Sequence, residues 1–325
     1  MWLLQAARSE PVWAFTIEQR EPSCSERSPP SVSAPLLFQP SPDAFYGFPH
    51  ARLITRVDSP YQRIEVWDTP QLGRLFTLDG RPMTSTGDEF IYHECMVHPA
   101  ALAHPSPRTA LVLGGGDGGA ARQLLKHSSI ERIVVAELDA QVVHLTREHL
   151  PEVHGGAFDD PRVELVIGDA AEYIAAAAAG ATPAQFDLIV FDLTPPDSPA
   201  AGLYTRAFYE QLKQVMSPRA ALSMHLGSPY YNAPRVAGLL DDLRAAFAIV
   251  RPMNTFVPLY GSLWMMATAS QTLDPAAVDV DTLRTRLAAR RLDSLKHYDP
   301  ALHAGLFSVS WSVRDKLSHV LKPSL

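Results

Sequence analysis

The chain has few cysteines and no long apolar run, and these absences exclude several classes of protein. Its 325 residues include two cysteines, Cys24 and Cys95, which are too few for a disulfide framework. Neither belongs to a Cys-x-x-Cys pair or a Cys/His cluster, so we expect no structural zinc. No apolar run reaches the roughly 18 residues that a membrane helix requires. The first residues lack the basic start of a signal peptide. We therefore expect a cytoplasmic protein without a membrane partner.

Basic residues are also in the minority. The chain has 28 Lys and Arg against 35 Asp and Glu, which gives a net charge of −7. This balance argues against nucleic acid as a partner and suits a cationic substrate. Negative charge also serves solubility in many proteins, so both interpretations stay open. A hydrophobic content of 46% with 19% charged residues is typical of a globular protein.

The composition divides the chain into three parts. Residues 1–44 are rich in proline and serine, and we expect a flexible leader there, or else a start codon assigned too early. Residues 45–98 contain an alternating segment, Arg63–Asp68, and a segment that closes on an Asp-Gly hairpin signal at Gly80. This pattern predicts a small antiparallel N-terminal β-domain, which ends in the start of a connecting helix.

Residues 99–325 alternate between expected strands and expected helices. The alternation predicts an α/β fold, namely a Rossmann-like doubly wound sheet of the class I methyltransferase kind with a C-terminal extension. In such sheets ligands bind beyond the carboxyl ends of the strands. We expect strands at 109–113, 132–136, 163–167, 187–191 and 220–225, and helices at 118–127, 139–149, 170–179, 205–215 and 233–246.

A glycine-rich turn, Gly114-Gly-Gly-Asp-Gly-Gly119, follows the first of these strands. Without β-carbons at Gly114 and Gly116, the backbone can bend sharply and approach a ligand closely. Glu137 ends the next strand, 23 positions after Gly114, and this is the spacing of a carboxylate that binds the hydroxyls of a ribose. Such turns also occur as plain strand–helix connections, but together with the spaced acid the turn favours a nucleoside site.

Two further acids refine this hypothesis. Asp169 ends the third expected strand, where it can accept a hydrogen bond from an exocyclic amine such as that of adenine, cap the following helix, or do both. Asp117 lies inside the glycine turn, where it would repel a phosphate and attract a cation. This favours an adenosyl sulfonium compound over NAD or FAD. The alternative is that Asp117 points outward and caps the helix that starts at Gly118.

A series of short segments occurs in one order along the chain from about Phe45, and in this set and order they resemble the spermidine synthase family of polyamine aminopropyltransferases. The segments are Tyr61-Gln62, Leu78-Asp-Gly80, Asp88-Glu-Phe-Ile-Tyr-His-Glu94, Leu113-Gly-Gly-Gly-Asp-Gly-Gly119, Glu137-Leu-Asp139, Phe186-Asp-Leu-Ile-Val-Phe-Asp192, Leu203-Tyr-Thr205, Phe208-Tyr209, Val257-Pro-Leu-Tyr260 and Tyr298-Asp-Pro-Ala-Leu-His303.

The resemblance implies a reaction and a set of site residues. In this family an amine takes the aminopropyl group of decarboxylated S-adenosylmethionine, which gives a longer polyamine and 5′-methylthioadenosine. The resemblance implies no permanently bound cofactor, no metal, and a homodimer or homotetramer. It places Glu137 on the ribose, Asp169 near the adenine and Asp117 on the aminopropyl ammonium. The implied cosubstrate residues are Gln62, Leu78, Gly114, Gly116, Asp117, Glu137, Asp169 and Ala170, and the implied amine residues are Tyr92, His93, Asp117, His225 and Tyr260.

The chain departs from the family pattern at three positions. Members usually carry Asp-x-x-Asp-Pro after the fourth strand, and their second acid is regarded as the proton acceptor. Here Asp192 matches the first acid and Pro195 replaces the second. Our catalytic candidates are therefore Asp192 and Asp197, although Asp197 is alternatively a solvated loop acid. His225 stands where many members carry a glutamine that helps to hold the amine, and Ala170 replaces a glycine.

Three functions remain to be compared. The first is an aminopropyltransferase that acts on a putrescine-like amine. The second is another transferase that uses S-adenosylmethionine itself, whose additional carboxylate Asp117 would repel. The third is a catalytically impaired homologue that binds a nucleoside or a polyamine, and Pro195 is the residue that supports it. We expect the first function. Trp264 either walls the amine groove or packs in the core.

Overall fold

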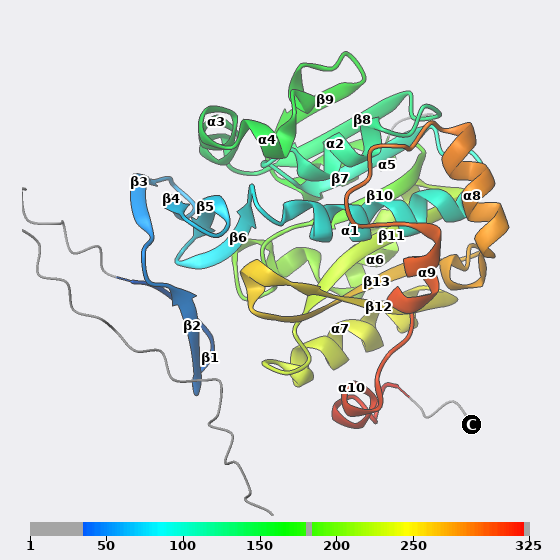
Figure 1. Cartoon of the computed structure of the whole chain (residues 1–325). Helices are drawn as coiled ribbons and strands as arrows, with labels where there is room; N and C mark the ends of the chain where they lie inside the picture. The colour runs from blue at the N-terminus through cyan, green and yellow to red at the C-terminus, as the bar shows by residue number, and fades with distance from the viewer. Residues whose placement is uncertain (1–34, 180–183, 322–325) are drawn as a thin grey trace, which may run out of the picture. The chain divides into compact units, whose positions relative to one another are not determined.

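The computed structural model describes residues 35–179 and 184–321 (Figure 1). Most of the expected leader, residues 1–34, lies outside the described residues. Its remainder forms a hairpin of β1 (Leu36–Ser41) and β2 (Ala44–Phe48). The prediction of a flexible leader is therefore wrong for residues 36–44. Leu36 and Phe38 lie on the same face of β1 and are buried. The ring centroids of Phe38 and Tyr46 lie 5.4 Å apart.

The next strands form the expected small antiparallel sheet. It contains β3 (Arg52–Asp58), β4 (Arg63–Thr69), β5 (Gly73–Leu78) and β6 (Arg81–Ser85), in that order. The Asp-Gly signal is confirmed, because Asp79 and Gly80 both adopt positive φ angles, 49° and 74°, in the turn between β5 and β6.

Helix α1 (Glu89–Ala103) leads into a second sheet of seven strands, ordered β12-β13-β11-β10-β7-β8-β9. Strands β7 to β11 run parallel, whereas β13 and β12 add an antiparallel edge. The chain passes from β7 outward to β8 and β9 and then returns to β10 on the other side of β7, so strand order reverses there. This confirms the doubly wound, Rossmann-like class. The bounds are β7 Thr109–Gly114, β8 Arg132–Glu137, β9 Val163–Ile167, β10 Phe186–Asp192, β11 Met216–Gly227, β12 Ile249–Val257 and β13 Ser262–Ser270.

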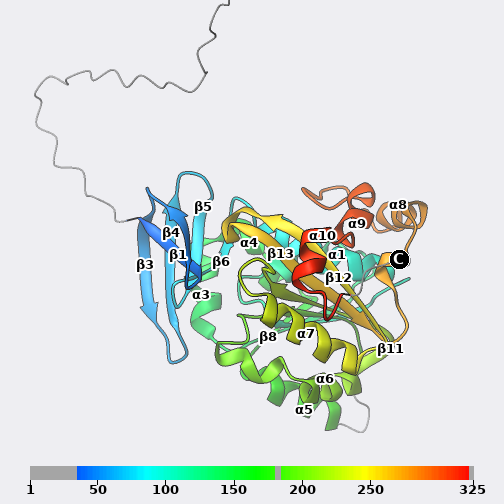
Figure 2. The same ribbon diagram turned by 90° about the horizontal axis from the view of Figure 1, so that it is seen from below.

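Helices cover both faces of this sheet (Figure 2). Strand β7 shows how the sequence directs the packing: Ala110 and Val112 belong to the core beneath α1 and α2, whereas Leu111 and Leu113 belong to the core beneath α6 and α7. The helices that follow α1 are α2 Gly119–Leu125, α3 Ala140–His149, α4 Pro151–His154, α5 Ala170–Ala179, α6 Arg206–Leu212, α7 Ala233–Ala246, α8 Val280–Ala289, α9 Pro300–Leu306 and α10 Trp311–Lys316.

The five helices expected beyond residue 99 are present with small differences at their ends. Helix α6 ends at Leu212 and continues as a 3₁₀ turn to Val215, and α2 starts one residue later than expected, after Gly118 with φ of 76°. Helix α1 runs through the expected domain boundary at residues 98 and 99, so the division into two domains stays a prediction. Among the described residues, no helix is both long and apolar enough to cross a membrane.

Glu94 on α1 anchors the C-terminal segment to this core. Its carboxylate is fully buried and accepts hydrogen bonds from the backbone amides of Lys296, His297 and Tyr298 at 2.8–2.9 Å. A buried carboxylate is costly without donors, and a backbone turn with three free amides is costly without an acceptor. Each partner therefore stabilises the other.

We predict that Glu94→Gln lowers the free energy of unfolding by about 2–3 kcal/mol, because the amide turns an NH₂ group toward backbone donors. Thermal and urea unfolding of the purified variant measure this effect. Glu131→Gln is the matched control, since the pair between Glu131 and Arg108 is exposed and is worth about 0–1 kcal/mol. Equal stability of the two variants would contradict the anchoring role.

Candidate active site

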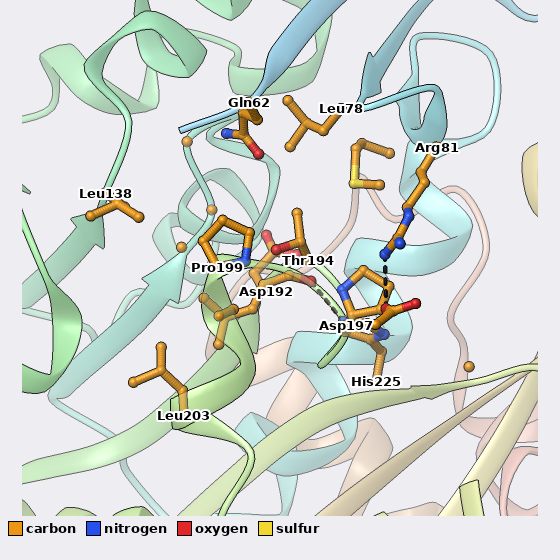
Figure 3. Close-up of a pocket in the computed structure, with 18 of the residues that line it drawn as sticks. Gln62, Leu78, Arg81, Leu138, Asp192, Thr194, Asp197, Pro199, Leu203 and His225 are labelled. Atoms are coloured by element: carbon orange, nitrogen blue, oxygen red, sulfur yellow. Dashed lines mark hydrogen bonds and ion pairs between the residues drawn. The ribbon is translucent and has the colours of Figure 1, made fainter. Parts of the chain in front are cut away.

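A cavity of about 660 Å³ opens at the carboxyl ends of the parallel strands, where strand order reverses. It brings together every residue that the sequence predicted for the site: Gln62, Leu78, Tyr92, His93, Gly114, Gly116, Asp117, Glu137, Asp169, Ala170, Asp192, Asp197, His225 and Tyr260. In Figure 3, Gln62 and Leu138 are drawn on one side of the cavity, and Asp197 and His225 on the other.

Glu137 at the end of β8 is held by the glycine turn. One carboxylate oxygen accepts the amide of Gly116 at 3.0 Å, and the other accepts the amide of Asp139 at 2.9 Å. A β-carbon at position 116 would lie 2.9 Å from the Glu137 side chain, so this close approach requires glycine. Burial raises the pKa of Glu137 to about 7.

Asp139 fixes the loop that carries Gln62. Its Oδ2 accepts hydrogen bonds from Gln62 Nε2 at 3.1 Å and from the Ser59 hydroxyl at 2.6 Å, while Oδ1 caps α3 through the amide of Gln141. The small sheet thereby delivers Gln62 to the cavity. Sequence reasoning noted the Glu-Leu-Asp segment but gave Asp139 no role. The signal was an acid two residues after the strand-end acid.

The sequence left open whether Asp117 caps the following helix or faces a ligand, and in the structure its side chain does the first and also lines the cavity. Its Oδ1 accepts the amide of Gly119 at 2.9 Å and so caps α2, while its side chain lines the cavity. Its Oδ2 lies 3.5 Å from Nε2 of His93. A β-carbon at position 119 would lie 2.2 Å from the His93 ring, so Gly119 makes room for this contact.

His93 lies among three carboxylates. Its Nδ1 is 2.9 Å from Glu89, and its Nε2 is 3.5 Å from Asp117 and 3.7 Å from Asp192. Burial lowers the pKa of His93, but Asp117, Asp192 and Glu89 outweigh burial and hold the pKa well above its ordinary value. His93 lines the cavity as expected, but only 2% of its side chain is exposed, and it contacts these carboxylates and the ring of Tyr92.

Asp192 ends β10 and lines the cavity with a largely buried carboxylate. Among the described residues its Oδ2 has no hydrogen-bond partner, because the 3.7 Å contact to His93 is too long. His93, Asp117 and Asp192 each offer one ligand atom within 4.8 Å of the others, a spacing that also suits a metal ion. Two carboxylates beside one imidazole would equally attract an organic cation.

Asp197 has two basic partners that the sequence did not reveal. Arg81 Nη1 lies 2.8 Å from its Oδ1, as Figure 3 shows, and Arg235 Nη2 lies 2.9 Å from its Oδ2. Burial raises the pKa of Asp197, but Arg235 and Arg81 outweigh this and lower the pKa. Both oxygens are therefore engaged, and the carboxylate is a weak proton acceptor.

Aromatic rings surround His225 on β11. Trp264 stacks on the imidazole at 5.9 Å between ring centroids, and Tyr92 and Tyr204 approach it edge-on at 6.2 and 6.3 Å. Trp264 thus lines the cavity and also packs on Tyr260, whose hydroxyl donates to the Met83 carbonyl. Burial lowers the pKa of His225.

The far end of the site is more open. Asp169 is exposed, and its Oδ1 accepts the amide of Ala171 at 2.7 Å, so it caps α5 and still lines the cavity. Several other lining residues had been given no role: Leu138, Thr194, Pro199 and Leu203. Leu138 and Leu203 belong to segments that carry the resemblance, but side chains without an ionisable group gave no chemical reason to assign them.

Comparison with known proteins identifies the family of the chain. The model of the spermine/spermidine synthase domain matches residues 89–281. The chain is 44% identical over 304 residues to the polyamine aminopropyltransferase of Nitrosomonas europaea, covering 93% of this chain and 92% of that protein. It is 36% identical over 260 residues to polyamine aminopropyltransferase 2 of Hyperthermus butylicus, covering 79% of this chain and 84% of that one.

Solved structures extend the likeness to the fold. A spermidine synthase in complex with the transition state analogue AdoDATO has a TM-score of 0.76 and 31% identity, covering 85% of this chain and 91% of that one. Spermidine synthase from Thermotoga maritima has a TM-score of 0.75 and 31% identity, covering 85% and 90%. The chain therefore belongs to the spermine/spermidine synthase family of aminopropyltransferase enzymes.

Proposed function

We propose that the enzyme transfers the aminopropyl group of decarboxylated S-adenosylmethionine to a putrescine-like amine, which gives a spermidine-type polyamine and 5′-methylthioadenosine. The observation that carries this proposal is the division of one cavity into a nucleoside end at Glu137 and a cation end at Asp117 and Asp192. A molecule that joins an adenosine to an ammonium-bearing chain through a sulfonium matches that division.

The nucleoside end supplies the groups that an adenosine requires. We assign the ribose hydroxyls to Glu137, the adenine amine to Asp169, and the methylthio side to Gln62 and Leu78. Gly114 and Gly116 line the cavity, and both must be glycine, because a β-carbon would lie 2.3 Å from the Asp192 carbonyl oxygen or 2.9 Å from the Glu137 side chain. Gln62 is preorganised by Asp139, so its ordering requires little further entropy on binding.

The cation end positions the two amines. We assign the aminopropyl ammonium to Asp117 and the attacking amine to Asp192, whose Oδ2 has no hydrogen-bond partner within the described part of the chain. His93, held by Glu89, keeps these carboxylates close together without neutralising both of them. The rings of Tyr92 and Tyr260 lie 6.1 Å apart and line the groove between the two ends. An aromatic wall stabilises an ammonium through its π-face.

The reaction needs alignment more than activation. A sulfonium is a good leaving group, so the enzyme must hold nitrogen, carbon and sulfur in line, and such positioning supplies up to roughly 7–11 kcal/mol in the best intramolecular cases. The amine must also lose a proton, because an alkylammonium of pKa about 10.4 has no lone pair.

The cytoplasmic location and the homo-oligomer stay expectations.

Incubation of the purified enzyme with decarboxylated S-adenosylmethionine and a mixture of putrescine, cadaverine, 1,3-diaminopropane and spermidine tests the proposal. Mass spectrometry should detect methylthioadenosine and one aminopropylated amine. We expect Asp192→Asn to lower kcat by about 100-fold, because it removes the charge that faces the amine. Asp197→Asn should cost less than about tenfold, because Arg81 and Arg235 already neutralise this acid.

Asp281→Asn, which changes a carboxylate that is 92% exposed, serves as the matched control and should retain wild-type kcat. A failure of the wild type to release methylthioadenosine above the protein-free background, despite tight methylthioadenosine binding, would contradict the proposal and favour a binding protein. A larger loss in Asp197→Asn than in Asp192→Asn would reverse our assignment of the two acids.

A second prediction concerns pH. With its pKa raised from 4.5 to about 7, Glu137 is ionised above pH 7 and protonated progressively below it. Because ribose hydroxyls donate to the ionised carboxylate, the Kd of methylthioadenosine should rise about tenfold per pH unit as pH falls below 7, until the carboxyl of the complex is itself protonated. Isothermal titration calorimetry between pH 5.5 and 8.5 measures this effect. Glu137→Gln should bind more weakly at pH 8 and lose the dependence. A wild-type Kd that stays constant over this range would refute the assignment.

A further inference from the structure

We propose that Glu89 is a positioning residue of the reaction, which acts on the cation end of the cavity through the ring of His93. This inference rests on the proposed aminopropyl transfer, which assigns the two amines to Asp117 and Asp192. It goes beyond that function, because it gives a role to a carboxylate that is not among the described residues lining the cavity.

Glu89 is a buried carboxylate with a partner at each oxygen. It is the first residue of α1, and 2% of its side chain is exposed. One oxygen accepts a hydrogen bond from Arg122 on α2, and the other lies 2.9 Å from Nδ1 of His93, one helical turn farther along α1. Burial raises the pKa of Glu89, but His93 and Arg122 outweigh burial and lower the pKa. The ionised side chain therefore accepts from both partners at once.

The contact with Glu89 decides which ring nitrogen of His93 faces the two acids. An ionised carboxylate only accepts, so Nδ1 carries a hydrogen and donates it to Glu89. Nε2 then lies 3.5 Å from Oδ2 of Asp117 and 3.7 Å from Oδ2 of Asp192. A half-turn of the ring would put a carbon atom where each nitrogen lies. The hydrogen bond to Glu89 opposes that turn.

The other contacts of the ring restrict its place more than the direction of its nitrogens. The ring lies against the backbone of Gly119, where a β-carbon would be 2.2 Å away, and the ring of Tyr92 meets it edge-on at 5.1 Å. Neither contact distinguishes a ring nitrogen from a ring carbon. At 3.5 Å or more, the contacts of Nε2 orient the ring more weakly than the 2.9 Å hydrogen bond at Nδ1. Within the described part of the chain, Glu89 is therefore the main anchor of the ring's orientation.

This orientation matters because both acids also line the cavity. The contacting atoms of His93, Asp117 and Asp192 all lie within 4.8 Å of one another, so a correctly turned ring offsets part of the repulsion between the acids. A turned ring would present a C–H edge to them, and the carboxylates would separate. In the proposed reaction, this would move the aminopropyl ammonium away from its alignment with the attacking amine. A misplacement of about 1 Å can cost about 100-fold in rate.

Glu89→Gln tests the inference, because an amide has one accepting oxygen for two donor partners. Either Arg122 or His93 then faces an NH₂ group. We compare kcat for aminopropyl transfer with the Kd of methylthioadenosine, which lacks the ammonium chain. Glu94→Gln is the matched control, since it removes another buried carboxylate of α1, whose partners are the backbone amides of residues 296–298.

We expect Glu89→Gln to lower kcat by about tenfold or more and to change the Kd of methylthioadenosine by less than about twofold. Glu94→Gln should retain the kcat of wild type, although it is less stable. If Glu89 acts through His93, adding Glu89→Gln to His93→Gln should lower kcat little beyond His93→Gln alone. Arg122→Gln removes the other partner of Glu89 and is the second variant if Glu89→Gln does not fold. It should also lower kcat without weakening methylthioadenosine binding.

Three results would overturn the inference while leaving aminopropyl transfer intact. They are a wild-type kcat in Glu89→Gln, a parallel weakening of methylthioadenosine binding that indicates a general structural role, and losses of Glu89→Gln and His93→Gln that add in full. A wild type without turnover would instead overturn the proposed function on which the inference rests.

Discussion

The site depends on the balance of charge around one buried imidazolium. His93 comes from α1, Asp117 from the glycine turn and Asp192 from the end of β10, and the ring nitrogens lie 2.9–3.7 Å from Glu89 and these two acids. Without the ring, the two carboxylates would face one another directly and repel. Asp117, Asp192 and Glu89 hold the pKa of His93 well above its ordinary value, so the ring offsets part of their negative charge. A cationic ligand completes that balance.

The glycines of the turn serve this arrangement by providing space. Gly116 admits the carboxylate of Glu137, and Gly119 admits the ring of His93, since a β-carbon at either position would lie within 3 Å of those side chains. The turn therefore joins the nucleoside end to the cation end. The sequence pattern alone did not reveal which side chains these glycines admit.

Local features of the sequence predicted most of this framework. The strands after residue 99, the acids at their ends and the Asp-Gly turn were all predicted, because each depends on neighbours along the chain. The pairing of Asp197 with Arg81 was not predictable, because it joins residues 116 positions apart. The orientation of His225 depends on the Leu193 carbonyl, which only the folded chain brings near. The hairpin at 36–48 was missed because its prolines concealed the alternation of Leu36 and Phe38.

In the proposed function, the carboxylates of Asp117 and Asp192 select a cosubstrate whose chain ends in an ammonium without a carboxylate beside it. Calorimetric affinities for decarboxylated S-adenosylmethionine and for S-adenosylmethionine itself, in wild type and in Asp117→Asn, test this most directly. We expect wild type to bind the decarboxylated compound at least about tenfold more tightly, a difference of about 1.4 kcal/mol, and Asp117→Asn to reduce this preference. Equal affinity for the two compounds in wild type would contradict it.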